Sequence, residues 1–94
     1  LLSVFPGSDA FSTDAWAVGI PAPTHVEPHV ARVTLNPSFV PAARDVVMVT
    51  YGAAKAEILR DVLQSNVEPR RLPSQLARRA GATWIVDRAA ASRL

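Results

Sequence analysis

The segment from Asp45 to Leu59 constrains the fold more than any other part of the sequence. It begins with an unbroken apolar run, Val46-Val47-Met48-Val49, passes through Gly52 and continues in an alanine-rich pattern with helical spacing. β-Branched runs favour strands, and an apolar run without alternation is typical of a strand that helices cover on both faces. The segment therefore predicts a central buried strand, a tight turn and the beginning of a helix.

The turn within this segment is a candidate anion-binding site. The first turn of a helix leaves backbone N–H groups unpaired, and the helix dipole adds partial positive charge there. Lys55, the only lysine of the chain, falls in or next to this turn, where the dipole disfavours a cation and a bound anion would remove the conflict. An exposed helical lysine is the competing interpretation, and the spacing alone favours it slightly. The glycine patterns of a Walker P-loop and of a dinucleotide fingerprint are missing.

Composition excludes several classes of function. The 94 residues suffice for one small domain or for a piece of a larger one, and 49% of them are hydrophobic, which argues against disorder. The sequence has no cysteine, which excludes disulfides and thiolate sites and fits an intracellular, cytoplasmic setting. A net charge of +2 is too small to indicate nucleic acid, and Arg70-Arg71 and Arg78-Arg79 are interpreted as solvated surface. We expect no membrane span and no signal peptide, because the apolar runs are short.

Apolar strands alternate with amphipathic helices along the chain. The patterns predict strands over Ala15–Ile20, Ala31–Leu35, Val46–Val49 and Thr83–Val86. They predict a short helix that begins at Asn36-Pro37 and that Pro41 limits. They also predict a long helix over Ala53–Gln64, a short helix over Pro73–Arg79 and a terminal helix that Asp87 caps. This order predicts an α/β fold with a mainly parallel sheet and flanking helices. Ligands of such sheets bind at the carboxyl ends of the strands, which is where Tyr51-Gly52 falls.

Other chemistry-bearing residues give weaker signals. His25 and His29 lie among prolines, so we interpret them as loop residues rather than metal ligands. No Gly-x-Ser-x-Gly elbow is present, which makes a serine triad a poor interpretation. Arg32 begins an alternating strand and could face a ligand, although an exposed strand arginine explains it equally well. Trp84 is predicted to lie in the core.

Six motifs in order resemble the carboxyl-terminal half of the 6-phosphogluconolactonase family. None is diagnostic singly, but together they cover nearly the whole chain. They are Ser3-Val4-Phe5-Pro6-Gly7, Arg32-Val33-Thr34-Leu35, Ala42-Ala43-Arg44, Gly52-Ala53-Ala54-Lys55-Ala56-Glu57-Ile58-Leu59, Leu72-Pro73-Ser74-Gln75-Leu76 and Thr83-Trp84-Ile85-Val86-Asp87-Arg88-Ala89-Ala90-Ala91.

The resemblance implies a function. The family hydrolyses 6-phosphoglucono-lactone to 6-phosphogluconate in the pentose phosphate pathway without a metal or a cofactor. Lys55 matches the family lysine that binds the substrate phosphate, which makes Lys55, Arg32 and Gly52 the candidate substrate-binding residues. The family's histidine base would align immediately before Leu1, so we assign no catalytic residue. Residues 1–94 are then one α/β unit, a Rossmann-like half of a larger domain, and we expect the chain alone to be inactive.

The chain also departs from the family pattern, and two other functions stay open. Asn36 replaces a usual threonine, Phe39-Val40-Pro41 replaces a leucine-asparagine type of sequence, and Tyr51 stands where a small residue is common. One alternative is a sugar-phosphate isomerase or deaminase of the same superfamily. The other is a non-catalytic module that binds an anion or a protein. The expected partners are a phosphorylated sugar lactone and a second copy of the chain at an exposed sheet edge, with no nucleic acid and no membrane.

Overall fold

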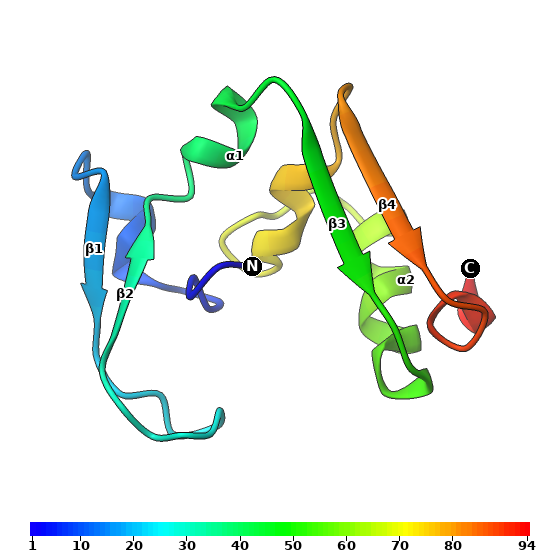
Figure 1. The fold of residues 1–94 in the computed structure, drawn as a ribbon, viewed down its shortest axis with the longest axis horizontal. Coiled ribbons are helices and arrows are strands. Elements are labelled where there is room, and N and C mark those ends of the chain that lie inside the picture. Colours follow the sequence, from blue (N-terminus) through cyan, green and yellow to red (C-terminus); the bar gives the residue numbers. More distant parts are fainter.

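Two separate two-stranded sheets form the framework of the molecule (Figure 1). The structure is a computed structural model that describes all residues from 1 to 94. One sheet is antiparallel and the other is parallel. The predicted α/β class is confirmed, and the parallel arrangement is confined to the second sheet.

The antiparallel sheet belongs to the first part of the chain. Strand β1 (Ala17–Ile20) pairs with β2 (Arg32–Leu35), with Ala17 opposite Leu35. The short 3₁₀ helix η1 (Asp9–Ser12) begins at Ser8, whose hydroxyl accepts a hydrogen bond from the amide of Ala10. A small core packs here, made of Val4, Ala10 and Ile20 together with the partly buried Phe5, Phe11 and Val18.

The parallel sheet forms a β-α-β unit in the second part of the chain. Strand β3 (Val46–Thr50) pairs with β4 (Ala82–Val86), and the crossover between them contains the 3₁₀ helix η2 (Ala53–Lys55), helix α2 (Ala56–Gln64) and the 3₁₀ helix η3 (Pro73–Ala77). Helix α1 (Phe39–Ala42) connects the two sheets, and the 3₁₀ helix η4 (Ala90–Arg93) ends the chain. None of these helices is long and apolar enough to span a membrane.

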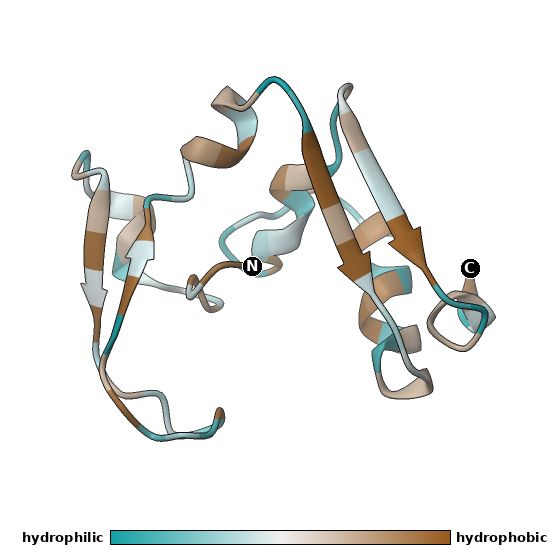
Figure 2. Ribbon diagram, viewed as in Figure 1, coloured by the Kyte–Doolittle hydropathy of each residue, from teal (hydrophilic) through white to brown (hydrophobic).

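Only one face of the parallel pair is covered. Figure 1 shows α2 behind β3 and β4, and the indole Nε1 of Trp84 donates to the carbonyl of Ala77 in η3 on the covered face. The opposite face exposes 61% of Val47, 67% of Val49 and 54% of Ile85. Figure 2 shows how apolar β3 is along its length. The sequence predicted a central strand with helices on both faces, whereas within these 94 residues β3 has one partner strand and one bare face.

The long helix begins differently from its predicted form. Its first three residues are a 3₁₀ turn, which has 3.0 residues per turn instead of 3.6 and so shifts the phase of the residues that follow. Helical spacing over the predicted range places Ala54 and Ile58 on one apolar stripe with Leu59 and Val62, but both residues are exposed. Ala56, Leu59 and Val62 are the buried residues of α2. The terminal helix is also shorter than predicted, because only Ala90–Arg93 forms a 3₁₀ turn.

Both arginine pairs lie at the surface, as predicted, because Arg70, Arg71 and Arg78 are exposed and Arg79 is half-buried, but their side chains also make contacts that were not predicted. Their guanidinium groups reach across the fold, because helix ends leave backbone carbonyls that need donors and aromatic faces attract cations. The Nη1 atom of Arg78 donates to the carbonyls of Val62 (3.2 Å) and Ser65 (2.7 Å), and the Nη1 atom of Arg79 donates to the carbonyl of Val40 (3.4 Å). The guanidinium of Arg70 lies 5.5 Å from the ring centroid of Phe11. Arg71 Nε lies 2.7 Å from Glu68 Oε2.

Candidate functional site

The turn that follows β3 has a conformation that requires glycine. Gly52 adopts a φ of 92°, in the region where a Cβ atom is strained. Tyr51 precedes it with 76% of its surface exposed, and the 3₁₀ turn Ala53–Lys55 follows it. The turn therefore lies at the carboxyl end of a parallel strand, as the sequence predicted.

Asp87 fastens this turn to the end of the neighbouring strand. The amide of Gly52 donates to both carboxylate oxygens of Asp87, at 3.1 Å to Oδ1 and 3.2 Å to Oδ2. Oδ1 also accepts from the amide of Ala90, the first residue of η4, at 2.8 Å, although the N-cap position of η4 is Ala89 and not the predicted Asp87. The contact with Gly52 was not predicted. The parallel register could have indicated it, since Thr50 lies opposite Val86 and the residues just past both strands must be neighbours.

Lys55 lies in the first turn before α2, as predicted. Its side chain is exposed and makes no ion pair. The amide of Lys55 donates to the carbonyl of Gly52 at 3.1 Å, whereas the amides of Ala53 and Ala54 donate to no group. Two backbone N–H groups and one ammonium are thus available for an anion, while the N–H of Gly52 is already satisfied.

A cleft of about 470 Å³ adjoins Lys55. Its lining is mostly apolar, with hydroxyl groups at Thr50, Tyr51 and Ser74. Leu1 also lines it, and the pKa of the Leu1 amino group is lowered by burial and, secondarily, by the positive charge of Lys55. The beginning of the chain and Lys55 therefore share one cleft. The remaining lining residues are Met48, Val49, Ile58, Leu59 and Val62.

Arg32 lies in the other sheet and does not line the cleft of Lys55. It is half-buried as the first residue of β2, and its Nη2 atom donates to the carbonyl of Pro28 at 2.8 Å. Its Nε atom is buried without a hydrogen-bond partner. The structure thus brings Lys55 and Gly52 together and leaves Arg32 apart from them.

The two histidines do not form a site. The ring of His25 meets the ring of Phe5 edge to face at 5.1 Å, and it lines a separate cleft of about 400 Å³. Nowhere do three or more histidine, cysteine, aspartate or glutamate residues gather as metal ligands would.

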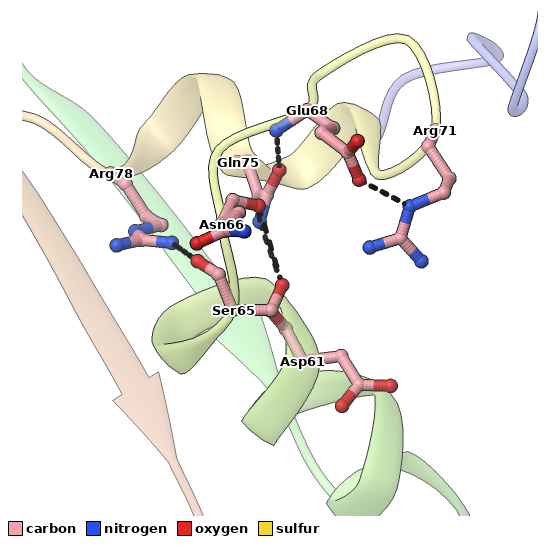
Figure 3. A network of polar contacts seen from close by, with 7 residues as sticks. All are labelled: Asp61, Ser65, Asn66, Glu68, Arg71, Gln75 and Arg78. Carbon is pink, nitrogen blue, oxygen red and sulfur yellow. Dashed lines mark hydrogen bonds and ion pairs between the residues drawn. The ribbon is translucent and has the colours of Figure 1, made fainter.

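A buried amide holds the segment that follows the cleft residue Ser74. Gln75 is 2% exposed, and its side chain joins the loop after α2 to η3 (Figure 3). Its Oε1 atom accepts from the amide of Glu68 at 2.6 Å, and its Nε2 atom donates to Ser65 Oγ at 3.3 Å and to the carbonyl of Asn66 at 3.0 Å. Gln75 therefore acts in structure, and it fixes the segment that carries the cleft residue Ser74.

Comparison with known proteins identifies the family. The family described as glucosamine-6-phosphate isomerases/6-phosphogluconolactonase matches residues 1–86. The chain belongs to this family. Because the match covers 86 of the 94 residues, it includes both sheets and the turn that carries Lys55, and it ends just before Asp87.

Three solved structures of 6-phosphogluconolactonases share the fold of the chain. The enzyme from Trypanosoma brucei superposes with a TM-score of 0.80 at 26% identity over 98% of this chain and 36% of that one. The Trypanosoma cruzi enzyme gives 0.78 at 30% identity over 99% and 36%, and the Leishmania guyanensis enzyme gives 0.72 at 32% identity over 94% and 34%. The chain thus spans about a third of the length of these relatives. No curated protein sequence matches it.

Proposed function

We propose that this chain is the phosphate-binding part of a 6-phosphogluconolactonase, which hydrolyses 6-phosphoglucono-lactone to 6-phosphogluconate in the pentose phosphate pathway. The turn of Lys55 carries the proposal, because it offers an ammonium and two unpaired amides at the carboxyl end of β3. Family membership supports it, and the three solved relatives are lactonases, which favours lactone hydrolysis over isomerisation or deamination. A cytoplasmic location is part of the same proposal.

The site residues divide into binding and chemistry. Hydrolysis adds water to the lactone carbonyl carbon and breaks its bond to the ring oxygen, which leaves a carboxylate and a free hydroxyl. Lys55 would hold the phosphate and orient the ring, while a separate base takes the proton of the attacking water. Residues 1–94 would form the carboxyl-terminal part of a larger domain. A histidine base immediately before Leu1 would enter the cleft that Leu1 and Lys55 already share.

Gly52 and Arg32 have narrower proposed roles. Gly52 would act through its conformation, because its amide is bonded to Asp87. Arg32 would make a secondary substrate contact from the other sheet, supported by its buried and unpartnered Nε atom.

Binding of 6-phosphogluconate to the chain tests this function, followed through backbone amide resonances. We expect shifts at Ala53, Ala54 and Lys55, and we expect Lys55→Gln to weaken binding about tenfold, which is the effect of losing one charged hydrogen bond. Arg60→Gln is the matched control, because Arg60 lies on α2 beside Asp61 and does not line the cleft. Equal affinity in both variants would refute the assignment of Lys55. Lactone hydrolysis by the 94-residue chain alone would refute the proposed external base.

We also propose that two copies of the chain associate at the exposed edge of the parallel pair, as the sequence predicts, and that this contact also covers the bare face beside that edge. Parallel sheets are normally covered on both faces, and Val47, Val49 and Ile85 form an apolar patch there. Val49→Lys should leave the fold intact, because the side chain is exposed, and should shift a dimer to monomer in analytical ultracentrifugation. A wild-type chain that stays monomeric at millimolar concentration would contradict this.

A further inference from the structure

Asp87 is connected to the candidate phosphate site through a single residue. The amide of Gly52 donates to both carboxylate oxygens of Asp87, and the carbonyl of Gly52 accepts from the amide of Lys55 at 3.1 Å. Both backbone polar groups of Gly52 are therefore used, one toward Asp87 and the other toward Lys55. A displacement of the carboxylate would be transmitted to the residue that carries the ammonium.

Asp87 makes more contacts than its bond to η4 requires. The amide of Ala90, at the start of η4, needs one acceptor oxygen, and Oδ1 accepts from it at 2.8 Å. Oδ2 has no partner other than the amide of Gly52. The second oxygen thus serves the turn after β3 alone, and it joins the carboxyl ends of the two parallel strands.

The carboxylate also determines which donors an anion can reach. It already occupies the N–H of Gly52, so an incoming phosphate is left with the amides of Ala53 and Ala54 and the ammonium of Lys55. Two anions on the same amide would repel each other. Asp87 therefore favours a phosphate position on the Lys55 side of the turn.

We propose that Asp87 is a positioning residue for phosphate binding, which holds the Gly52 turn so that Lys55 and the amides of Ala53 and Ala54 converge on the phosphate. The proposal rests on the proposed function of Lys55 and adds to it a residue that does not touch the substrate. Its effect should appear in affinity and in the state of the Gly52 amide, while the antiparallel sheet stays unchanged.

The test compares Asp87→Ala and Asp87→Asn with the wild-type chain, using 6-phosphogluconate as the probe and amide resonances as the readout. We expect Asp87→Ala to weaken binding about tenfold and to move the Gly52 resonance, since small misplacements of binding groups are costly. Asp87→Asn retains one carbonyl oxygen as an acceptor and should recover part of the affinity. Asp45→Asn is the matched control, because Asp45 is an exposed carboxylate just before the opposite end of β3.

The outcomes separate this proposal from the proposed function. If the wild-type chain does not bind the probe, the proposed function fails, and this inference fails with it. If the wild type binds the probe and Asp87→Ala binds it equally well, only the positioning role is overturned. If Asp87→Ala binds it more tightly, the positioning role is also overturned, and the carboxylate is identified as a competitor of the phosphate. If Asp87→Ala does not fold, Asp87→Asn tests the positioning role instead. An Asp87→Asn chain with wild-type affinity and an unmoved Gly52 resonance would overturn that role.

Discussion

The antiparallel unit, built on β1 and β2, and the parallel unit, built on β3 and β4, bury their apolar residues to different extents. In the antiparallel unit, Val4, Ala10 and Ile20 meet in one small core. In the parallel unit Ala56, Leu59 and Val62 of α2 are buried, but the outer face of β3 and β4 remains bare. An antiparallel sheet can leave one face to solvent, whereas a parallel sheet is normally covered on both. The unit that carries the candidate site is therefore the one whose packing is incomplete within these 94 residues.

Each unit is held together by one buried amide side chain, and backbone and side-chain contacts of Arg70 connect the units. Asn36 serves the antiparallel unit and Gln75 the parallel unit, at 4% and 2% exposure. Between the units, the amide of Gly7 donates to the carbonyl of Arg70 at 2.7 Å, and the guanidinium of Arg70 lies over Phe11. Substitutions can therefore destabilise one unit at a time or weaken the contacts between the two units.

The largest effect is expected from Gln75→Ala. This change removes three hydrogen bonds, leaves the amide of Glu68 and the carbonyl of Asn66 without their partner, and opens a cavity, which together should cost about 3 kcal/mol of unfolding free energy. Urea denaturation measures the loss, and hydrogen exchange locates it. Arg71→Ala is the control, because its ion pair with Glu68 is exposed and should cost less than about 1 kcal/mol. Equal losses in both variants would contradict the role of Gln75.

Asn36→Ala should have a somewhat smaller effect, about 2 kcal/mol. Its Nδ2 atom donates to the carbonyls of Thr13 and Ala15, both at 2.8 Å, and its Oδ1 atom accepts from the amide of Ser38 at 3.0 Å. The backbone partners of both buried amide side chains belong to exposed residues whose freed groups water can reach, so the smaller expected loss comes from the smaller cavity that asparagine leaves. If the units unfold separately, hydrogen exchange should accelerate in β1 and β2 and leave β3 and β4 protected. Acceleration throughout both sheets would show that the chain unfolds as one body.

Arg70→Ala tests the connection between the units. Loss of the cation–π contact with Phe11 should cost about 1 kcal/mol or less, because Arg70 is exposed. A double-mutant cycle with Phe11→Leu isolates the coupling between the two side chains. A coupling energy near zero would mean that the backbone bond from Gly7 to Arg70 and the hydrogen bond from Arg70 Nη1 to Ser12 Oγ at 3.4 Å join the units without help from the cation–π contact.

Local patterns predicted the elements, whereas non-local geometry decided the contacts. The apolar run gave β3, Pro41 limited α1 to four residues, and the amphipathic pattern gave a helix that ends at Gln64. These features depend on neighbours in sequence, so they can be predicted from it. The contact of Asp87 with Gly52 spans 35 residues and depends on strand register.

The same limit applied to the candidate site. The sequence placed Lys55 in the first helical turn after a parallel strand, which the structure confirms. It could not indicate that Gly52 would already be bonded, or that Arg32 would lie in a separate sheet. It predicted the arginine pairs correctly as surface residues, but it could not predict their hydrogen bonds, because no local pattern reveals which distant carbonyls need a donor. Side chains that bond across the chain are therefore what sequence reasoning missed.

The smallest predicted effect concerns the cleft in the parallel unit. Burial, and then the charge of Lys55, lower the pKa of the Leu1 amino group below its ordinary value of 8.0. The folded chain thus binds fewer protons than the unfolded chain between the lowered pKa and 8.0, so stability should rise with pH across that window. Lys55→Gln should raise the pKa of the amino group part of the way toward 8.0 and flatten the rise. NMR titration of a chain that begins at Leu1 measures both, with Arg60→Gln as the control. An unchanged pKa in Lys55→Gln would mean that the Lys55 ammonium points away from the cleft, which would also weaken its assignment to the phosphate.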